Sequence, residues 1–250
     1  MTSNLARDGF QILRHVFEPL KCEHIATDLE AILRRNGTGA IHTRSQNLVG
    51  GRNLQAHWSG WLDLVNVDSV RQLMTDHLGE RFGLVRILFF DKPPGQTWHL
   101  ALHRDGAIAV AAHHDPPAPY CRPNHKAGVP HVQADESLLG QMLTLRLHLD
   151  PMHADNGPLT VIPGSHAEQS ETTEEPLEIH CGRGDVFVMR PLLLHGSRSS
   201  TEGNQDHRRV VHLEFASDGA LSPPYQWFRY DEAGILPKPS HPQPDTARSP

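Results

Sequence analysis

The sequence predicts a mainly β fold with flanking α-helices, built as an antiparallel double sheet with the helices packed outside. Three observations favour this class. Two helix-like segments, the first of them amphipathic, come early in the chain. From Phe82 onward the pattern changes to roughly eight short β-rich runs, and turn signals such as Pro163-Gly164 separate them.

The first expected helix covers residues 17–37 and follows a short strand at 9–17. Gly37 is a natural end for it, because glycine readily adopts the left-handed conformation that closes helices. A second helix is expected at 69–79, where Gly79 ends it. The apolar stripe of the first helix consists of Leu20, Ile25, Leu29 and Ile32 or Leu33.

The expected strands are rich in β-branched, aromatic and leucine residues and end at proline or glycine. They cover residues 82–92, 142–150, 159–166, 177–181, 184–190 and 208–216. The stretch from Gly106 to Glu136 has little periodicity and four prolines before Gly128, so a long loop is expected there. We expect one domain over residues 1–236 and a disordered tail over 237–250.

The composition excludes several classes of partner. A net charge of −6 disfavours general attraction to nucleic acid or to anionic membranes. The longest apolar run falls short of a membrane span, and the first residues lack a signal-peptide pattern. Three cysteines without metal-type spacing indicate a reducing, cytoplasmic compartment. The pattern does not fix the oligomeric state.

The chain contains 19 histidines, and histidine is the commonest metal ligand. Two histidines and one carboxylate on one face of an iron ion leave the other face open for reactants. The compact His-x-Asp pattern supplies two such ligands. Context favours His103-Asp105, which follows a strand and turn at the entrance of the expected loop. The pattern occurs four times, as His103-Asp105, His113-Asp115, His148-Asp150 and His153-Asp155.

The best candidate for the third ligand is His195, which a strand and a turn deliver after an apolar run. An arginine beginning the buried strand at 208–216 needs an anionic partner. Arg208 and Arg209 point to opposite faces of that strand. Hydrophobicity alone favours Arg209 as the buried residue, whereas a polar barrel interior favours Arg208, so periodicity leaves both open.

Several of these segments together resemble the phytanoyl-CoA dioxygenase family of iron(II)/2-oxoglutarate oxygenases, and in particular a bacterial branch of it. The resemblance covers roughly residues 8–216. The segments that carry the resemblance are ILFFDKPPGQTWHLALHRDGAIAV, KAGVPHVQ, MLTLRLHLDPMHADNGPLTVIPGSH, GDVFVMRPLLLHGS and RRVVHLEFA.

The resemblance implies a double-stranded β-helix, the cupin-like jelly roll, with iron(II) held by His103, Asp105 and His195. It implies that Arg208, with Ser197, binds the co-substrate 2-oxoglutarate. With O2, such an enzyme hydroxylates a C–H bond of a small organic substrate and releases succinate and CO2. A carboxylate at Asp105 favours hydroxylation, because halogenases of this class have a small residue there.

Two departures and two rival functions accompany this interpretation. Relatives commonly read Trp-His-Gln-Asp at the metal pair, whereas this chain has Leu102 and Arg104 in that segment. The segment 106–136 is unusually rich in histidine and leaves the substrate unidentified. The rivals are a cupin-like metalloenzyme that does not use 2-oxoglutarate and a non-catalytic binding module on the same scaffold.

Overall fold

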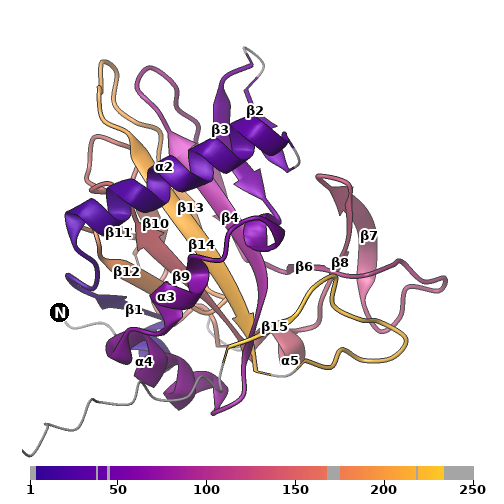
Figure 1. The fold of residues 1–250 in the computed structure, drawn as a ribbon. Coiled ribbons are helices and arrows are strands. Elements are labelled where there is room, and N and C mark those ends of the chain that lie inside the picture. The colour runs from indigo at the N-terminus through magenta and orange to yellow at the C-terminus, as the bar shows by residue number, and fades with distance from the viewer. Residues whose placement is uncertain (1–3, 38, 44–45, 168–174, 218, 234–250) are drawn as a thin grey trace, which may run out of the picture.

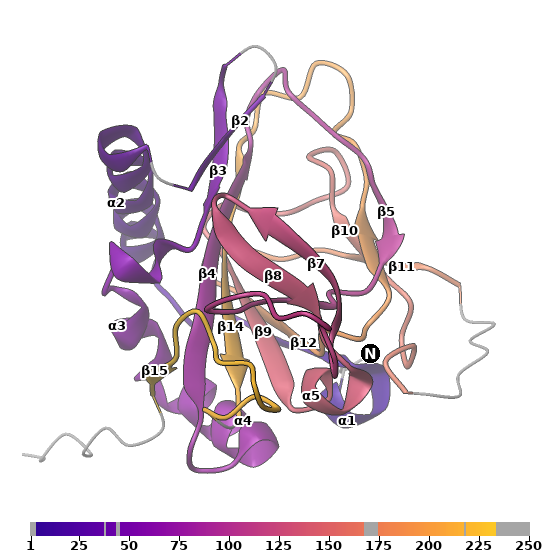
Figure 2. The same cartoon turned by 90° about the vertical axis from the view of Figure 1, so that its right-hand side faces the viewer.

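The computed structural model describes residues 4–37, 39–43, 46–167, 175–217 and 219–233. The tail expected at 237–250 lies outside the described residues. Two views show three layers: helices on one side, a large sheet in the middle and a smaller sheet on the other side (Figures 1 and 2). This is the antiparallel double sheet with outer helices that the sequence predicts, in the double-stranded β-helix form that the resemblance implies.

The large sheet is antiparallel throughout and follows the order β1-β12-β9-β14-β4-β3-β2, with β15 also paired to β4. Its longest strands, β4 and β14, pair along their whole lengths. The bounds are β1 Phe10–Leu13, β2 Ala40–His42, β3 Leu48–Arg52, β4 Gly83–Lys92, β9 Met142–His148, β12 Val186–Met189, β14 Arg208–Ala216 and β15 Asp231–Glu232.

The smaller sheet has the order β11-β10-β13-β5 and faces the large sheet (Figure 2). Its strands are short, and β5 forms one edge. The bounds are β5 Leu100–His103, β10 Leu159–Val161, β11 Leu177–Ile179 and β13 His195–Ser197.

The helices α2, α3 and α4 cover the outer face of the large sheet (Figures 1 and 2). The two helices expected from the sequence are confirmed as α2 and α4. Helix α2 starts with Pro19 in its first turn and ends where Gly37 adopts φ 62°. The bounds are α1 Leu5–Asp8, α2 Pro19–Asn36, η1 Leu54–Ala56, α3 Trp61–Val65, α4 Asp68–Leu78 and α5 Glu136–Leu139.

The main core lies between these helices and the large sheet, and the alternation along β14 shows why. Val211, Leu213 and Phe215 are buried in this core, at most 1% exposed. Burial of each such side chain stabilises the fold by about 1.5–3 kcal/mol. Arg208 and Glu214 point to the opposite face, into a cavity between the two sheets. The polar face of this strand is therefore the interior of the jelly roll.

The prediction of a long loop at 106–136 is wrong, because this segment forms a third sheet with the order β6-β8-β7. Five of the six β7 side chains are exposed, so the strand has no apolar alternation. Residues Ala127 and Gly128, both with positive φ, close the β7–β8 hairpin. The bounds are β6 Ala107–Ala109, β7 Cys121–Lys126 and β8 Val129–Gln133.

All three cysteines are free thiols, and two of them, Cys22 and Cys181, are buried. Within the described ranges, no helix combines the length and the apolar character that crossing a membrane requires.

Candidate metal centre

Strands β5 and β13 place two histidines opposite each other on the smaller sheet. His103 and His195 are direct partners in the antiparallel register, and their ring centroids lie 4.4 Å apart. Gly196 makes this close approach possible. A Cβ atom at Gly196 would lie 2.6 Å from the carbonyl oxygen of Leu100 on β5, so any side chain there would push the strands apart.

Asp105 completes a group of three potential metal ligands. Its backbone N–H donates to the carbonyl of Pro191, 2.9 Å away, which fixes the chain just after β5. Its carboxylate oxygens lie 3.6 Å from Nε2 of His103 and 3.5 Å from Nε2 of His195. All three ligand atoms lie within 4.8 Å of one another, and no other such group occurs among the described residues. The arrangement is suited to holding one metal ion.

Both imidazole rings are oriented by the backbone. Nδ1 of His103 lies 2.9 Å from the carbonyl oxygen of Ala101, and Nδ1 of His195 lies 2.9 Å from that of Leu193. A carbonyl oxygen only accepts, so each Nδ1 carries the proton and donates. In the neutral form of each ring, Nε2 therefore keeps its lone pair, which points toward Asp105. Such outer hydrogen bonds fix the tautomer in metal-binding histidines.

The protonation states also fit a metal. Burial alone would raise the pKa of Asp105, but the hydrogen bond and charge of the protonated form of His103, together with the charge of Arg86, hold it well below its ordinary value, and Asp105 in turn raises the pKa of His103. A metal ion bound at Nε2 of His103 would replace that proton. Burial lowers the pKa of His195, which keeps its ring neutral near pH 7. Metal ligands must be deprotonated, so an ionised carboxylate and a neutral imidazole are the required forms.

Two of the other His-x-Asp copies have different local roles. Asp150 forms ion pairs with Arg209 and Arg183. His153 lies 3.2 Å from Asp206 at the surface. His148 is fully buried, and burial lowers its pKa well below the ordinary value. None of these contacts assembles two histidines and a carboxylate.

The triad opens into a cavity of about 490 Å³ between the two sheets. This volume is typical of pockets for small molecules. The structure brings all the site residues proposed from the sequence to this one cavity: His103, Asp105, His195, Ser197 and Arg208.

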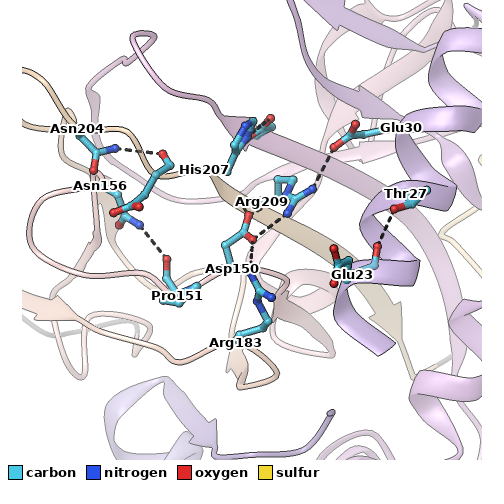
Figure 3. Close-up of polar contacts among 12 residues, drawn as sticks. Glu23, Thr27, Glu30, Asp150, Pro151, Asn156, Arg183, Asn204, His207 and Arg209 are labelled. Atoms are coloured by element: carbon cyan, nitrogen blue, oxygen red, sulfur yellow. Dashed lines mark hydrogen bonds and ion pairs between the residues drawn. The ribbon is translucent and has the colours of Figure 1, made fainter. Parts of the chain in front are cut away.

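The two arginines at the start of β14 have opposite surroundings. Arg208 points into the cavity, is 4% exposed and has no ion pair with any carboxylate of the described chain. Its Nε has no hydrogen-bond partner among the described residues, and burial, together with repulsion from Arg146, lowers its pKa to about 9. Arg209 lies on the other face, where Nε and Nη2 donate to Asp150 at 2.8 and 2.9 Å and Nη1 donates to Glu30 (Figure 3).

Two further buried cations beside Arg208 escaped the sequence analysis as site residues. Lys92 is its direct neighbour on β4, and burial, with repulsion from Arg208 and Arg146, lowers the pKa of Lys92 to about 7. Its ammonium donates to Ser197 Oγ at 3.2 Å and to the carbonyl of Arg198. Arg146 on β9 is 6% exposed, its Nε has no partner, and burial lowers its pKa to about 10.

Buried charges without counter-charges are costly. Because none of these three neighbouring cations pairs with a carboxylate of the described residues, they indicate the binding place of an anion. The alternation of Thr144, Arg146 and His148 on β9 was the available sequence signal for Arg146, since it marks a polar interior face. The fold and the site together define a class: a jelly-roll metalloenzyme that binds a small anion beside its metal.

Comparison with known proteins supports this class and narrows it. The model of the phytanoyl-CoA dioxygenase (PhyH) family matches residues 5–210, so the chain belongs to this family. The protein is therefore an enzyme of the non-haem iron- and 2-oxoglutarate-dependent dioxygenase class. Comparison with curated protein sequences gives no match.

Solved structures share the fold at low sequence identity. AviO1 from Streptomyces viridochromogenes Tue57 is 21% identical, with a TM-score of 0.58 over 88% of this chain and 94% of that one. EctD from S. alaskensis, with 2-oxoglutarate and 5-hydroxyectoine, is 16% identical, with a TM-score of 0.62 over 85% and 73%. SnoN, a non-haem alpha-ketoglutarate-dependent epimerase from nogalamycin biosynthesis, is 14% identical, with a TM-score of 0.60 over 85% and 77%.

Proposed function

We propose that this protein hydroxylates a C–H bond of a small organic substrate, using iron(II), 2-oxoglutarate and O2, with release of succinate and CO2. The observation that carries the proposal is the convergence of His103, Asp105 and His195 at the wall of a cavity. This cavity also holds buried cations that pair with no carboxylate of the described residues. A metal ion beside a dicarboxylate would use both features at once.

In this proposal, Nε2 of His103, Nε2 of His195 and the Asp105 carboxylate hold iron(II). Three protein ligands on one side leave the remaining coordination positions for reactants. When bound, iron(II) and 2-oxoglutarate supply the oxidising chemistry with O2, and one oxygen atom enters succinate while the other enters the substrate. The protein contributes fixed ligands and a cavity between two sheets that limits the access of water.

Arg208 binds the distal carboxylate of 2-oxoglutarate in this proposal, and Ser197 adds a hydroxyl. Arginine suits this role because its planar fork binds both oxygens of a carboxylate. Lys92 and Arg146 lie close enough to influence the pKa of one another or of Arg208, so they add positive potential at the same end of the cavity. The dicarboxylate would offset a buried charge that the described residues leave uncompensated.

Arg104 has a positioning role in the proposal. Its side chain is exposed, but Nε donates to the carbonyl of Leu192 at 2.8 Å and Nη2 to that of Ser165 at 2.9 Å. These bonds connect the segment between His103 and Asp105 to the turn before His195 and to the turn that follows β10. Arg104, which stands where relatives commonly have glutamine between the two metal ligands, thus supports the geometry of the triad.

The test is the charge-transfer band that forms when 2-oxoglutarate chelates iron(II), measured without oxygen, together with succinate release in air. The purified protein should show both, and Asp105→Ala should lose both. Asp155→Ala is the matched control, because Asp155 belongs to another His-x-Asp pair and its side chain is exposed. It should behave like the unmodified protein.

The rival functions give different results in the same experiment. A cupin-like metalloenzyme that does not use 2-oxoglutarate would bind iron but show no band. A non-catalytic binding module would retain no metal after gentle purification. Full activity of Asp105→Ala would show that the ligand assignment is wrong.

We also propose that residues 1–236 form a single domain, which the continuous large sheet from β1 to β15 supports. A cytoplasmic location is proposed as well, supported by three free cysteines. The cavity volume supports a small-molecule substrate.

A further inference from the structure

The cavity carries more positive charge than the proposed cofactors account for. Its lining contains two carboxylates, Asp105 and Glu214, and six cationic side chains. Iron(II) and the 2-oxoglutarate dianion would cancel each other, so the excess of cations would persist after both bind. The whole chain has a net charge of −6, so this excess is local to the cavity. The six cations are Arg52, Arg86, Arg104, Lys126, Arg146 and Arg208.

Four of these six cations already have a role. Arg146 and Arg208 lie at the proposed 2-oxoglutarate end, and Arg104 donates to two carbonyl groups. Arg86 forms a buried bidentate pair with Glu214, with nitrogen–oxygen distances of 2.8 and 2.7 Å. Both oxygens of Glu214 are used in this pair. The two cations that remain are Arg52 and Lys126.

Arg52 is the last residue of β3 and is half-buried. Its guanidinium carbon lies 5.9 Å from the centroid of the Phe90 ring, which supports the side chain from one side. In the described chain, its guanidinium has neither an ion pair nor a hydrogen bond. Burial lowers the pKa of Arg52, and the charge of Arg86 lowers it further.

Lys126 approaches the same cavity from a different element. It is the last residue of β7 and the one residue of that strand that is not fully exposed. The β7–β8 hairpin lies in front of the large sheet and carries Lys126 to the cavity (Figure 2). Its ammonium also has no ion pair within the described ranges. Burial lowers its pKa, and the charges of Arg86 and Arg52 add to the effect.

Two cations that repel each other, are partly buried and have no ion pair with any described residue favour an anion between β3 and the hairpin. We propose that Arg52 and Lys126 bind an anionic group of the substrate, either a carboxylate or a phosphate monoester. Both side chains also interact electrostatically with Asp105, so this group and the proposed metal share one cavity. The inference rests on the proposed function and adds the chemical class of its substrate.

The test uses three small probes on the iron(II)- and 2-oxoglutarate-loaded protein without oxygen: inorganic phosphate, acetate and the neutral analogue acetamide. Calorimetry measures binding, while the charge-transfer band reports whether 2-oxoglutarate stays bound. At least one anion should bind saturably without loss of the band, and acetamide should not bind. Tighter binding of phosphate would identify a phosphate monoester, and tighter binding of acetate would identify a carboxylate.

Variants assign the binding to the two side chains. Arg52→Gln and Lys126→Gln should each weaken binding of the anion by about tenfold or more, the size expected for the loss of one charged hydrogen bond. Arg52→Lys should lose less, because it keeps the charge. Arg122→Gln removes an exposed arginine from the same strand β7 and should change nothing. A retained band in every variant shows that the fold and the metal site persist.

Three results would overturn the proposal: no saturable binding of either anion, binding that the Arg52 and Lys126 variants do not weaken, or binding that abolishes the band. The last result would place the anion at Arg208 instead. A protein that forms no band at all contradicts the proposed function itself and with it this inference, so the two failures are distinguishable.

Discussion

Replacing Arg208 by glutamine tests which of two adjacent arginines binds 2-oxoglutarate. Arg208 is 4% exposed, and within the described chain it has no carboxylate partner to lose. Loss of one partner of a buried charge pair costs about 2–5 kcal/mol. Because Lys92 and Arg146 remain nearby, we expect the lower end of this range. The Kd of 2-oxoglutarate should therefore rise about 30-fold.

The assay is titration of 2-oxoglutarate into the iron(II)-loaded protein without oxygen, followed by the charge-transfer band. Arg209→Gln is the matched control on the opposite face of the same strand. It should leave the Kd unchanged but lower the unfolding free energy, because it breaks the hydrogen bonds to Asp150 and Glu30.

The unfolding free energy of the metal-free protein gives a second readout. An arginine with a structural role would stabilise the fold, whereas an unpaired buried charge destabilises it. We therefore expect Arg208→Gln to be at least as stable as the unmodified protein when no ligand is present. The reasoning is refuted if the Kd changes less than about threefold, or if Arg209→Gln raises it equally.

Three further predictions follow from local geometry. Gly196→Ala should lower the affinity for iron about 10–100-fold in a chelator competition assay, because the added methyl group would lie 2.6 Å from a β5 carbonyl oxygen. Gly182→Ala is the control: the added methyl group has room there, so this variant should bind iron normally. The folded-state pKa of Lys92 is about 7 and its ordinary value is 10.5, so the unfolded state binds the extra proton between these values and the unfolding free energy rises with pH there. In denaturant titrations Lys92→Met should lose this rise; an identical pH profile for both proteins would show that Lys92 is not the cause. Glu214→Gln should cost about 3–5 kcal/mol by leaving Arg86 buried and unpaired. Replacing both Arg86 and Glu214 by methionine should lower the unfolding free energy less than Glu214→Gln does. Equal losses of unfolding free energy in the two variants would argue against a coupled pair.

The elements that could be predicted from the sequence are those with a strong apolar period. Helices α2 and α4 and strands β4, β9, β12 and β14 each bury a continuous face, which their residues display directly. The metal triad of His103, Asp105 and His195 could be proposed from the sequence because these residues lie near the ends of predicted strands, next to turns. The sequence context then favoured one of the four His-x-Asp copies, and the resemblance to a known family pointed to the same copy.

The parts that could not be predicted depend on contacts distant in the sequence. Strand β5 has three exposed residues among four, and β13 has three residues including Gly196, so neither shows a period. Their pairing nevertheless brings the two histidines together. Arg208 and Arg209 could not be distinguished by periodicity because the jelly-roll interior is polar. The partner that holds Arg209 outside is Asp150, which lies 59 residues away.

Cation sites were missed for the same reason. Lys92 and Arg146 lie on strands that the sequence predicts, without a pattern that assigns them to a site, and Lys126 lies in a segment expected to be a loop. A charged residue on a buried strand shows its role only when the opposite wall of the cavity is known. For Arg52, that wall is the β7–β8 hairpin, about 75 residues further along the chain.

The most direct measurement is anomalous diffraction at the iron edge from crystals grown without oxygen with iron(II) and 2-oxoglutarate. We expect one strong peak in contact with Nε2 of His103, Nε2 of His195 and the Asp105 carboxylate, with 2-oxoglutarate reaching Arg208. A peak elsewhere, or one that any of these three side chains fails to contact, would contradict the proposed metal site.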